Sequence, residues 1–305
     1  MTQTQGTVPK GTAAHGIGAK APRLGLDWTN TLFLGVAHAM GVVGLVYLFA
    51  VKASPWTLGL AGVWFLFCAF GITGGYHRLF AHCAYKAAAP LRAFYLLFGA
   101  ASVQNSALKW SSDHRRHHTY TDEDRDPYNI NKGFWWAHIG WVLCKAEDSE
   151  IKGVDDLKQD KLVMLQHRFY VPIAIFIAVG VPAAIGALWG DALGAFLVAG
   201  FLRLVVQWHA TFAVNSVAHC IGSRPFCKKT TARNSFVTAI ITMGEGYHNF
   251  HHRFQLDYRN GIRWFHFDPT KWFVWSMSKV GGTWALRRTP NARIESARAE
   301  ARSTN

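Results

Sequence analysis

Four long apolar stretches constrain the fold of this chain more than any other feature. They run from about Thr31 to Val51, from about Trp56 to Gly75, from about Tyr170 to Trp189 and from about Ala192 to Val217. A helix needs roughly 20 apolar residues to cross the hydrocarbon core of a bilayer. Any one stretch alone is compatible with a buried helix of a soluble protein. Four stretches, joined in pairs by short turns at residues 52–55 and 190–191, predict a membrane protein with four spanning helices.

Composition and charge support this interpretation. Half of the 305 residues are hydrophobic and 16% are charged, whereas soluble proteins carry about 25% charged residues. The net charge of +14 in a soluble protein would suggest a nucleic-acid partner. Here 13 of the 32 Lys and Arg lie between Tyr76 and Phe169, and 14 follow His219. The positive-inside rule therefore predicts an inner or plasma membrane protein with both termini and its polar segments in the cytoplasm, and no nucleic-acid partner.

The same pattern divides the chain into three parts. Residues 1–28 are polar, show no cleavable signal and predict a disordered arm. Residues 29–286 form the membrane domain, with a cytosolic cap built from residues 76–169 and 218–286. Residues 287–305 predict a charged tail that is frayed or disordered and has a mild attraction to anionic lipids. Within the cap, Pro90 to Val103 is apolar but too short to span, so it is either an interfacial, re-entrant helix or a helix packed under the cap.

Nine of the fifteen histidines fall in four clusters. The clusters are HRLFAH (His77, His82), HRRHH (His114, His117, His118), NSVAH (His219) and HNFHH (His248, His251, His252). A lone histidine is usually a hydrogen-bonded core or surface residue, and HRRHH alone is compatible with a basic surface helix. All four clusters, on the predicted cytoplasmic side, indicate a metal site instead. The five cysteines form no CxxC pair, which argues against thiolate-bound zinc and against a disulfide framework.

The spacing within two clusters indicates two metals. Residues three and four apart share one face of a helix, so His114 lies below both His117 and His118. The latter two point about 100° apart, and one helix can present imidazoles to two neighbouring points. HNFHH repeats this spacing, and two such helices facing each other could hold two metals. Histidines at the span ends would complete the shells, and neutral imidazole suits Zn, Cu, Fe or Ni.

The wider motifs carry a resemblance to a known family. They are GITGGYHRLFAH (71–82), QNSALKWSSDHRRHH (104–118), DPYN (126–129), GFWWAHIGW (133–141), NSVAH (215–219) and GEGYHNFHH (244–252). With them the chain resembles, from about Asp27 to about Trp275, the membrane acyl-CoA desaturases of the stearoyl-CoA (delta-9) type, including their bacterial members. The resemblance implies an all-α fold of four transmembrane helices with a cytosolic helical cap around a di-iron centre.

The resemblance also implies a division of the ligands between two irons. One iron would take the residues His77, His82, His114, His118 and His251. The other would take the residues His117, His219, His248 and His252, with Asn215 approaching it through water. The adjacent pairs in the two HxxHH motifs thus go to different irons, which agrees with the helical geometry.

The activity that this resemblance implies is the O2-dependent insertion of a cis double bond, delta-9 in type, into a long-chain acyl group. A methylene offers no polar handle, so the length of the tunnel must set which carbon meets the irons. Phe65 and Ala69, on the second span before His77, are expected to shape its closed end. The sequence itself does not fix the length of the acyl chain or the position of the double bond.

The acyl carrier is also left open by the resemblance. Contacts of the family with coenzyme A correspond to Asn105, Trp110, Asp113 and Lys145. Two positions depart from the pattern: Ser112 and Cys144 stand where animal members carry arginines that hold coenzyme A phosphates. An acyl-lipid or an acyl carrier protein therefore stays open as substrate beside acyl-CoA.

A separate protein is expected to deliver the electrons, since no HPGG haem motif is visible. Candidates are a ferredoxin, a rubredoxin or a cytochrome b5 with its reductase. Cations that could steer an acidic donor are Lys228, Lys229, Arg233, Arg253, Arg259 and Arg263, unless they only reflect the positive-inside bias. Two rival functions remain: a fatty-acyl or alkane hydroxylase, which would yield an alcohol, and a metal transporter, whose ligands would lie near the bilayer midplane.

Arg203 lies inside the fourth apolar stretch, where a charge is costly. It starts a polar series at spacing four, formed by Arg203, Gln207, Thr211, Asn215 and His219. One interpretation is that the series faces the bundle interior and orders water or hydrogen bonds toward the metal site. The other is that Arg203 pairs with buried acceptors and only orients the helices.

Overall fold

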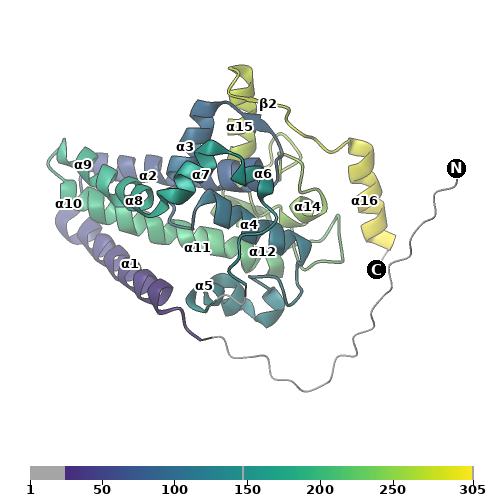
Figure 1. Cartoon of the computed structure of the whole chain (residues 1–305), viewed down its shortest axis with the longest axis horizontal. Helices are drawn as coiled ribbons and strands as arrows, with labels where there is room; N and C mark the ends of the chain where they lie inside the picture. Colours follow the sequence, from purple (N-terminus) through teal and green to yellow (C-terminus); the bar gives the residue numbers. More distant parts are fainter. Residues whose placement is uncertain (1–24, 146–147, 304–305) are drawn as a thin grey trace.

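The computed structural model describes residues 25–145 and 148–303, so nearly all of the predicted N-terminal arm lies outside the described residues. Four helices are long and apolar enough to cross a membrane: Trp28–Val51, Pro55–Ala81, Tyr170–Ala187 and Ala192–Cys220. They confirm the predicted four-span, all-helical architecture. The second and fourth spans run past their predicted ends at Gly75 and Val217 into the cap. In Figure 1 the spans extend to one side and the cap gathers at their other ends.

Each of the four spans combines α-helical segments with one segment of wider, π-helical winding (η). The first holds α1 (Trp28–Tyr47) and η1 (Leu48–Lys52), and the second holds α2 (Pro55–Phe70) and η2 (Gly71–Ala81). The third holds α8 (Tyr170–Ile175), η5 (Phe176–Gly180) and α9 (Val181–Ala187). The fourth holds α10 (Ala192–Gly194), η6 (Ala195–Leu202), α11 (Arg203–Asn215) and α12 (Val217–Cys220).

The cap is built from short helices and one small antiparallel ladder. Its first part holds α3 (Ala89–Ala100), α4 (Ala107–Thr119), the 3-10 turn η3 (Ile130–Lys132), η4 (Trp136–Gly140), α5 (Trp141–Leu143), α6 (Asp155–Lys158) and α7 (Lys161–Arg168). Its second part holds α13 (Phe236–Ile241), α14 (His248–Arg253), α15 (Pro269–Lys279) and α16 (Asn291–Ser303). Strand β1 (Lys86–Ala87) pairs with β2 (Thr283–Trp284), with Lys86 opposite Trp284.

One carboxylate ties the two helical hairpins together at the end of the spans remote from the cap. Asp191, in the turn between α9 and α10, accepts hydrogen bonds from Tyr47 Oη at 2.7 Å and Thr57 Oγ1 at 2.6 Å. Backbone amides of Ser54 and Gly194 also donate to it. Because these donors come from the first, second and fourth spans, the turn fixes how the hairpins meet.

The short apolar stretch at residues 90–103 forms helix α3, which lies against η2. Its contact with η2 is close because glycines face each other: a Cβ on Gly71 would lie 2.4 Å from the backbone nitrogen of Gly99. A Cβ on Gly99 would in turn lie 2.3 Å from the ring of Tyr76. Tyr95 of α3 is fully buried in this contact. The helix therefore fixes η2, on which the first histidine cluster lies.

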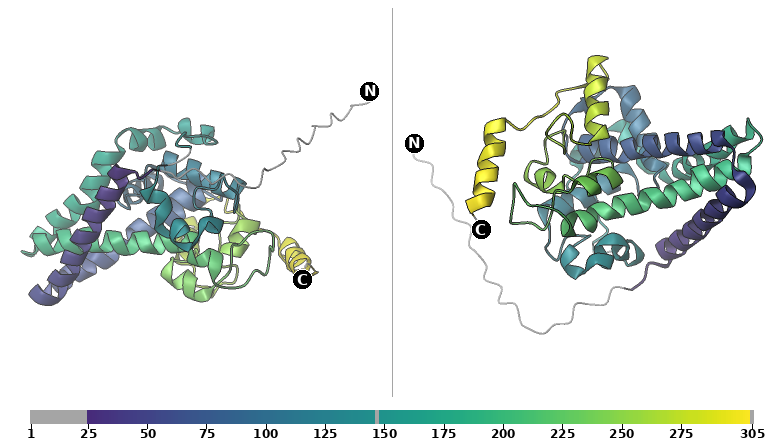
Figure 2. Two further views of the ribbon diagram at one scale, coloured as in Figure 1. Left: turned by 90° about the horizontal axis from the view of Figure 1, so that it is seen from below. Right: turned by 180° about the vertical axis from the view of Figure 1, so that it is seen from behind.

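The charged C-terminal segment, predicted to be frayed or disordered, forms helix α16 over Asn291–Ser303, so that prediction was wrong. Ile294, Ala297 and Ala301 recur on one face of this helix and are buried against the cap. Since three apolar residues among charged ones at this spacing make only a narrow stripe, composition alone suggested a solvated tail. Figures 1 and 2 show α16 at the edge of the cap, reached by an extended segment from β2.

The buried guanidinium of Arg203 donates hydrogen bonds to backbone carbonyls of several helices. It donates to the carbonyls of Ala199 (3.0 Å), Ala101 (3.1 Å) and Ala178 (3.0 Å), and to Gln207 Oε1 (3.1 Å). These acceptors belong to the fourth span, the end of α3 and the third span. The contacts are those of a residue that orients helices, which supports the second of the two interpretations.

Candidate metal centre

The first two histidines are brought to one face by the π-helical winding of η2. His77 and His82 are five residues apart, and the amide of His82 donates to the carbonyl of His77 at 3.1 Å. In an α-helix residues five apart diverge, whereas the i→i+5 bond of a π-helix places them one above the other. Their ring centroids lie 4.8 Å apart. The local winding therefore converts a spacing of five into a pair of converging imidazoles.

The HRRHH cluster lies on α4, as the sequence predicted. Ser106 caps this helix, accepting from the amide of Lys109, and Trp110 stacks on His114 with ring centroids 4.7 Å apart. The HNFHH cluster lies on α14, which faces α4. His118 Nε2 lies 3.0 Å from His251 Nε2, and His117 Nε2 lies 3.3 Å from His252 Nε2. The two adjacent pairs thus meet each other in register.

All nine histidines converge in two groups. The first group is His77, His82, His114, His118 and His251, and the second is His117, His219, His248 and His252. Within each group one nitrogen of every ring lies within 4.8 Å of the others. These are the two sets that the resemblance implied for two irons. Their geometry allows each group to hold one metal ion.

Three of these rings are oriented from behind by oxygen atoms that the sequence reasoning missed. His77 Nδ1 lies 3.0 Å from Glu245 Oε2, and His117 Nδ1 lies 2.8 Å from Asp126 Oδ1. His219 Nδ1 lies 2.6 Å from Thr231 Oγ1, which itself donates to Asp122. An oxygen partner at Nδ1 fixes the ring and leaves Nε2 as the metal-binding nitrogen. In the sequence, the two carboxylates were visible only as the acidic residues of the GEGYHNFHH and DPYN motifs.

The two carboxylates are ionised in this setting. Burial raises the pKa of Glu245, but the opposing effect of His77 and Arg78 is greater and lowers it to about 2. For Asp126, burial likewise raises the pKa, and His117 with two backbone amides brings it below its usual range. Glu245 and Asp126 therefore place a negative charge behind one ring of each histidine group, which favours a cation at the opposite nitrogen of that ring.

The nitrogen atoms that face inward suit a metal cation. His219 Nε2 is buried and has no hydrogen-bond partner among the described residues, an arrangement that is costly unless the atom binds something. Burial, reinforced by neighbouring imidazoles, holds the pKa of the cap histidines His82, His114, His118, His248, His251 and His252 well below 6.5. These rings are therefore neutral, which is the form that binds metals. The donor set fits two borderline transition-metal ions.

A cavity of about 1100 Å³ opens beside the two groups. Its inner part follows one face of the second span, where Phe65, Ala69, Thr73 and His77 succeed each other at spacing four and line it. His114 and His248 complete the metal-side wall. The cavity therefore leads from the apolar interior of the spans past both histidine groups to the cap.

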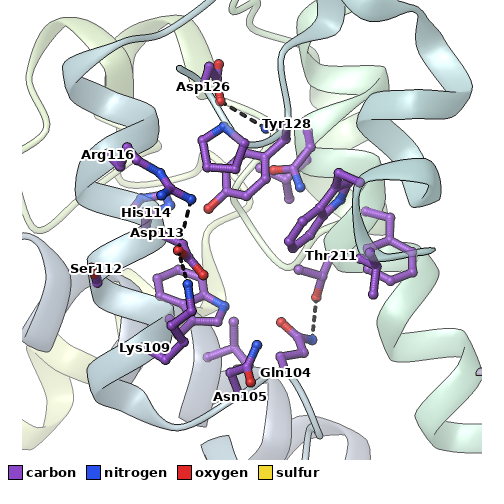
Figure 3. Close-up of a pocket in the computed structure, with 18 of the residues that line it drawn as sticks. Gln104, Asn105, Lys109, Ser112, Asp113, His114, Arg116, Asp126, Tyr128 and Thr211 are labelled. Atoms are coloured by element: carbon purple, nitrogen blue, oxygen red, sulfur yellow. Dashed lines mark hydrogen bonds and ion pairs between the residues drawn. The ribbon is translucent and has the colours of Figure 1, made fainter. Parts of the chain in front are cut away.

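The outer part of the cavity is polar and charged. Asn105, Trp110, Asp113 and Lys145, which the resemblance assigned to the acyl carrier, all line it. Figure 3 shows Lys109 and Arg116 on either side of Asp113, at 2.6 and 3.2 Å from its carboxylate. Ser112 faces the same region, but its hydroxyl is bonded to the backbone of Lys152. Cations thus remain at this end although arginine is missing at positions 112 and 144.

The polar series that starts at Arg203 only partly reaches the cavity. Gln207, Thr211 and Asn215 line it, and Thr211 Oγ1 accepts a hydrogen bond from Gln104 (Figure 3). Arg203 does not belong to the lining. Asn215 faces the cavity four residues before His219, so it can approach a ligand held by the second group.

The cations suggested for donor docking have different surroundings. Arg253 pairs with Glu300, and Arg259 pairs with Asp257. Arg233 donates to the carbonyl of His219 and to that of Gly222. Lys229 is exposed. Arg233 therefore links the cap surface directly to the backbone of a candidate ligand.

Comparisons with known proteins agree with this site. The sequence profile of the fatty acid desaturase family matches residues 53–283. The chain is 47% identical over 273 residues to a probable acyl-CoA desaturase of Schizosaccharomyces pombe, covering 88% of this chain and 56% of that protein. It is 41% identical over 282 residues to acyl-CoA desaturase 1 of Saccharomyces cerevisiae, covering 89% and 54%.

The chain spans about half the length of these two yeast relatives. Its alignment with stearoyl-CoA desaturase 5 of Bos taurus is more complete: 36% identity over 289 residues covers 92% of this chain and 86% of the bovine protein. The family profile covers the second, third and fourth spans and all nine clustered histidines. The chain therefore belongs to the fatty acid desaturase family.

Proposed function

We propose that this protein is an O2-dependent fatty acyl desaturase that inserts a cis double bond, delta-9 in position, into a long-chain saturated acyl group. The metal centre is a pair of irons, one in each histidine group. The overall reaction takes one –CH2–CH2– unit, O2, two electrons and two protons, and yields –CH=CH– and two waters. The electrons come from a separate donor protein.

A single observation carries this proposal. Both histidine groups face one wall of a long cavity whose inner part lies among apolar residues of the spans and whose outer part carries cations. An acyl chain with a charged carrier has this distribution of polarity. A site of this shape brings an inert methylene beside two metals, which a metal transporter does not require.

The irons, when bound, supply the activation of O2. The protein itself contributes by holding the ligand rings and the acyl chain in fixed positions. Glu245, Asp126 and Thr231 hold three of the rings, so that the inward nitrogens keep fixed directions. The cavity excludes water from the reacting carbons and, through Phe65 and Ala69 at its inner part, limits how far the chain can enter.

The carrier is an anionic group that the outer cavity can hold: coenzyme A, a lipid head group or the prosthetic group of an acyl carrier protein. Lys109, Lys145 and Arg116 line this part of the cavity. Lys and Arg both bind phosphate, although only Arg offers a two-pronged contact. The names of the relatives favour acyl-CoA. Purified enzyme supplied with stearoyl-CoA, a stearoyl phospholipid or stearoyl-acyl carrier protein in parallel separates the carriers.

The orientation follows from the same charge pattern. We place both termini and the cap in the cytoplasm, because Lys and Arg gather in the segments that form the cap. The donor, of ferredoxin, rubredoxin or cytochrome b5 type, then reaches the cap from the cytoplasm. Labelling of single exposed cysteines with a membrane-impermeant reagent in sealed vesicles tests this orientation.

The activity is tested in a host that lacks unsaturated fatty acids. Expression of the chain should restore growth, and gas chromatography of the lipids should show a cis monounsaturated product with the bond at carbon nine. His117→Ala should abolish the product, while His38→Gln, at a histidine outside both groups, should retain it. A hydroxylated product, or an iron-free protein that is fully folded, would overturn the proposal.

A further inference from the structure

Residues 285–303, which we call the strap, run along the cap and include helix α16. The amide of Arg287 donates to the carbonyl of Ala84, two residues after His82, and its carbonyl accepts from the amide of Tyr258. The amide of Thr289 then donates to Asp257 Oδ2 at 2.7 Å. The strap therefore runs from the end of the first histidine cluster toward α14, and its path is fixed by backbone contacts (Figure 1).

Helix α16 covers the back of the helix that carries the last histidine cluster. Ile294 and Ala297 of α16 form one buried cluster with Phe226, Phe250 and Phe254. Phe250 lies on α14 between His248 and His251, and it is 1% exposed. At the end of α14, Arg253 Nη2 lies 2.7 Å from Glu300 Oε2. The apolar face and the ion pair together connect α16 to α14.

Helix α14 depends on such outside contacts. It has six residues, far below the 12–15 that an isolated helix needs to be even marginally stable. Asn249 ties one side of it to the carbonyls of Cys227 and Ala232. The opposite support is the phenylalanine cluster that α16 closes. Without that cover, Phe250 would face water and α14 would lose the packing that sets its rotation.

We propose that the strap is a positioning element of the metal centre, which holds α14 in the rotation that aims His248, His251 and His252 at their two groups. The inference rests on the proposed function only in taking the metals to be iron. It predicts an asymmetry. Helix α14 supplies two of the four histidines in the second group but one of the five in the first. Weakening the strap should therefore empty the second group before the first.

The direct test introduces a charge at the covered face. Ile294→Asp places a carboxylate in the buried cluster, and Ala297→Asp does so from a second position on the same buried face. Ser296→Asp is the matched control, because it adds the same charge to the exposed face of the same helix. Ile294→Leu serves as the conservative variant. All four are made in the full chain and purified in detergent.

Iron per polypeptide and the rate of iron release to a chelator are the readouts. Wild type, Ser296→Asp and Ile294→Leu should hold two irons. Ile294→Asp and Ala297→Asp should fall toward one iron, with release from the weaker site faster by about tenfold or more, and with unchanged helical circular dichroism. Two irons released at the wild-type rate, or equal loss from both groups, would overturn the inference.

A second measurement separates this inference from the proposed function. Hydrogen exchange in the metal-free protein should show less protection of α14 amides in Ile294→Asp than in Ser296→Asp, whatever the metal. If the wild type binds no iron but the two variants still differ in the protection of α14, the di-iron proposal fails and the positioning role of the strap stands. Equal protection of α14 in both variants would show that the strap does not position this helix.

Discussion

Glu245 Oε2 lies 3.0 Å from His77 Nδ1, and the other oxygen of the same carboxylate lies 2.9 Å from Arg78 Nη2. Consecutive residues of η2 thus share one buried anion, which comes from the segment just before α14. Asn260 donates to the same carboxylate at 2.6 Å. Asp268 gives Arg78 a second anionic partner. The contact joins the second span to the cap at the metal centre.

The first prediction concerns this carboxylate. Glu245→Gln keeps the shape of the side chain but removes its charge, so the His77 ring loses its anionic partner and Arg78 keeps Asp268 as its anionic partner. The affinity for iron in the first group should fall by about 10–100-fold. Chelator competition measures this loss group by group. Glu295→Gln, at an exposed position of α16, is the control, and equal iron affinity in both variants would show that the carboxylate does not support the ligand.

The second prediction concerns acid. The six cap histidines with lowered pKa values are neutral in the folded protein, whereas in the unfolded chain they titrate near 6.5. Below pH 6.5 the unfolded state therefore takes up more protons, and stability is lost as the pH falls from 6.5 toward the folded pKa values. Each unit of pH below 6.5 costs about 1.4 kcal/mol per histidine that stays neutral.

Thermal unfolding of metal-free protein between pH 8 and 5 measures this effect. The unfolding temperature should be nearly constant above pH 7 and should drop steeply below 6.5. Bound iron should be released over the same window, because protons and metal compete for the same nitrogens. The loss due to Glu245 has the same sign but a lower window, between 4.5 and about 2. An unfolding temperature that stays level down to pH 5 would contradict the buried, neutral state of these rings.

The main architecture could be predicted because it depends on composition over long windows. An apolar stretch of the length of Trp28–Val51 has few alternatives to a spanning helix. The histidine clusters could also be predicted, because the HxxHH spacing on α4 and α14 directs adjacent rings toward two different metal positions. Both inferences use only local periodicity, which the sequence contains in full.

Other features depend on contacts between distant segments. The π-helical winding of η2, which aligns His77 with His82, is not contained in the local periodicity. Glu245 and Asp126 could be quoted within motifs, but only the fold shows which ring each one contacts. Helix α16 was misjudged because its stability comes from Phe226, Phe250 and Phe254, which lie far away in sequence. In each case the sequence does not show which distant segment of the chain packs against the residue.

The third prediction concerns the inner end of the cavity. Ala69 is buried and lines the cavity one turn beyond Thr73, so Ala69→Leu should fill space that the end of a long chain needs. One methylene of mismatch changes discrimination by roughly tenfold or more. The ratio of C18 to C16 products should therefore fall by about tenfold.

Gas chromatography of fatty acid esters from expressing cells gives this ratio. Val63→Leu is the matched control, because Val63 lies on the same helix but is 45% exposed, outside the cavity. The control should leave the product profile unchanged. An Ala69→Leu profile identical to that of the wild type would place the end of the substrate elsewhere.

The last prediction concerns Arg203, whose contacts favour a structural role. Arg203→Leu removes the donor to the carbonyls of Ala101 and Ala178, on two other helical segments, and leaves those buried oxygens with one partner fewer. The cost should be about 3 kcal/mol, seen as a drop of roughly 5–10 °C in the unfolding temperature. Arg203→Lys should lose part of this stability, since an ammonium cannot reach all of these acceptors at once.

Iron content per folded protein should stay at the wild-type value in both variants, because Arg203 lies outside the cavity lining. If Arg203→Leu instead lost iron without a change in unfolding temperature, the polar series from Arg203 to His219 would serve the metal centre after all.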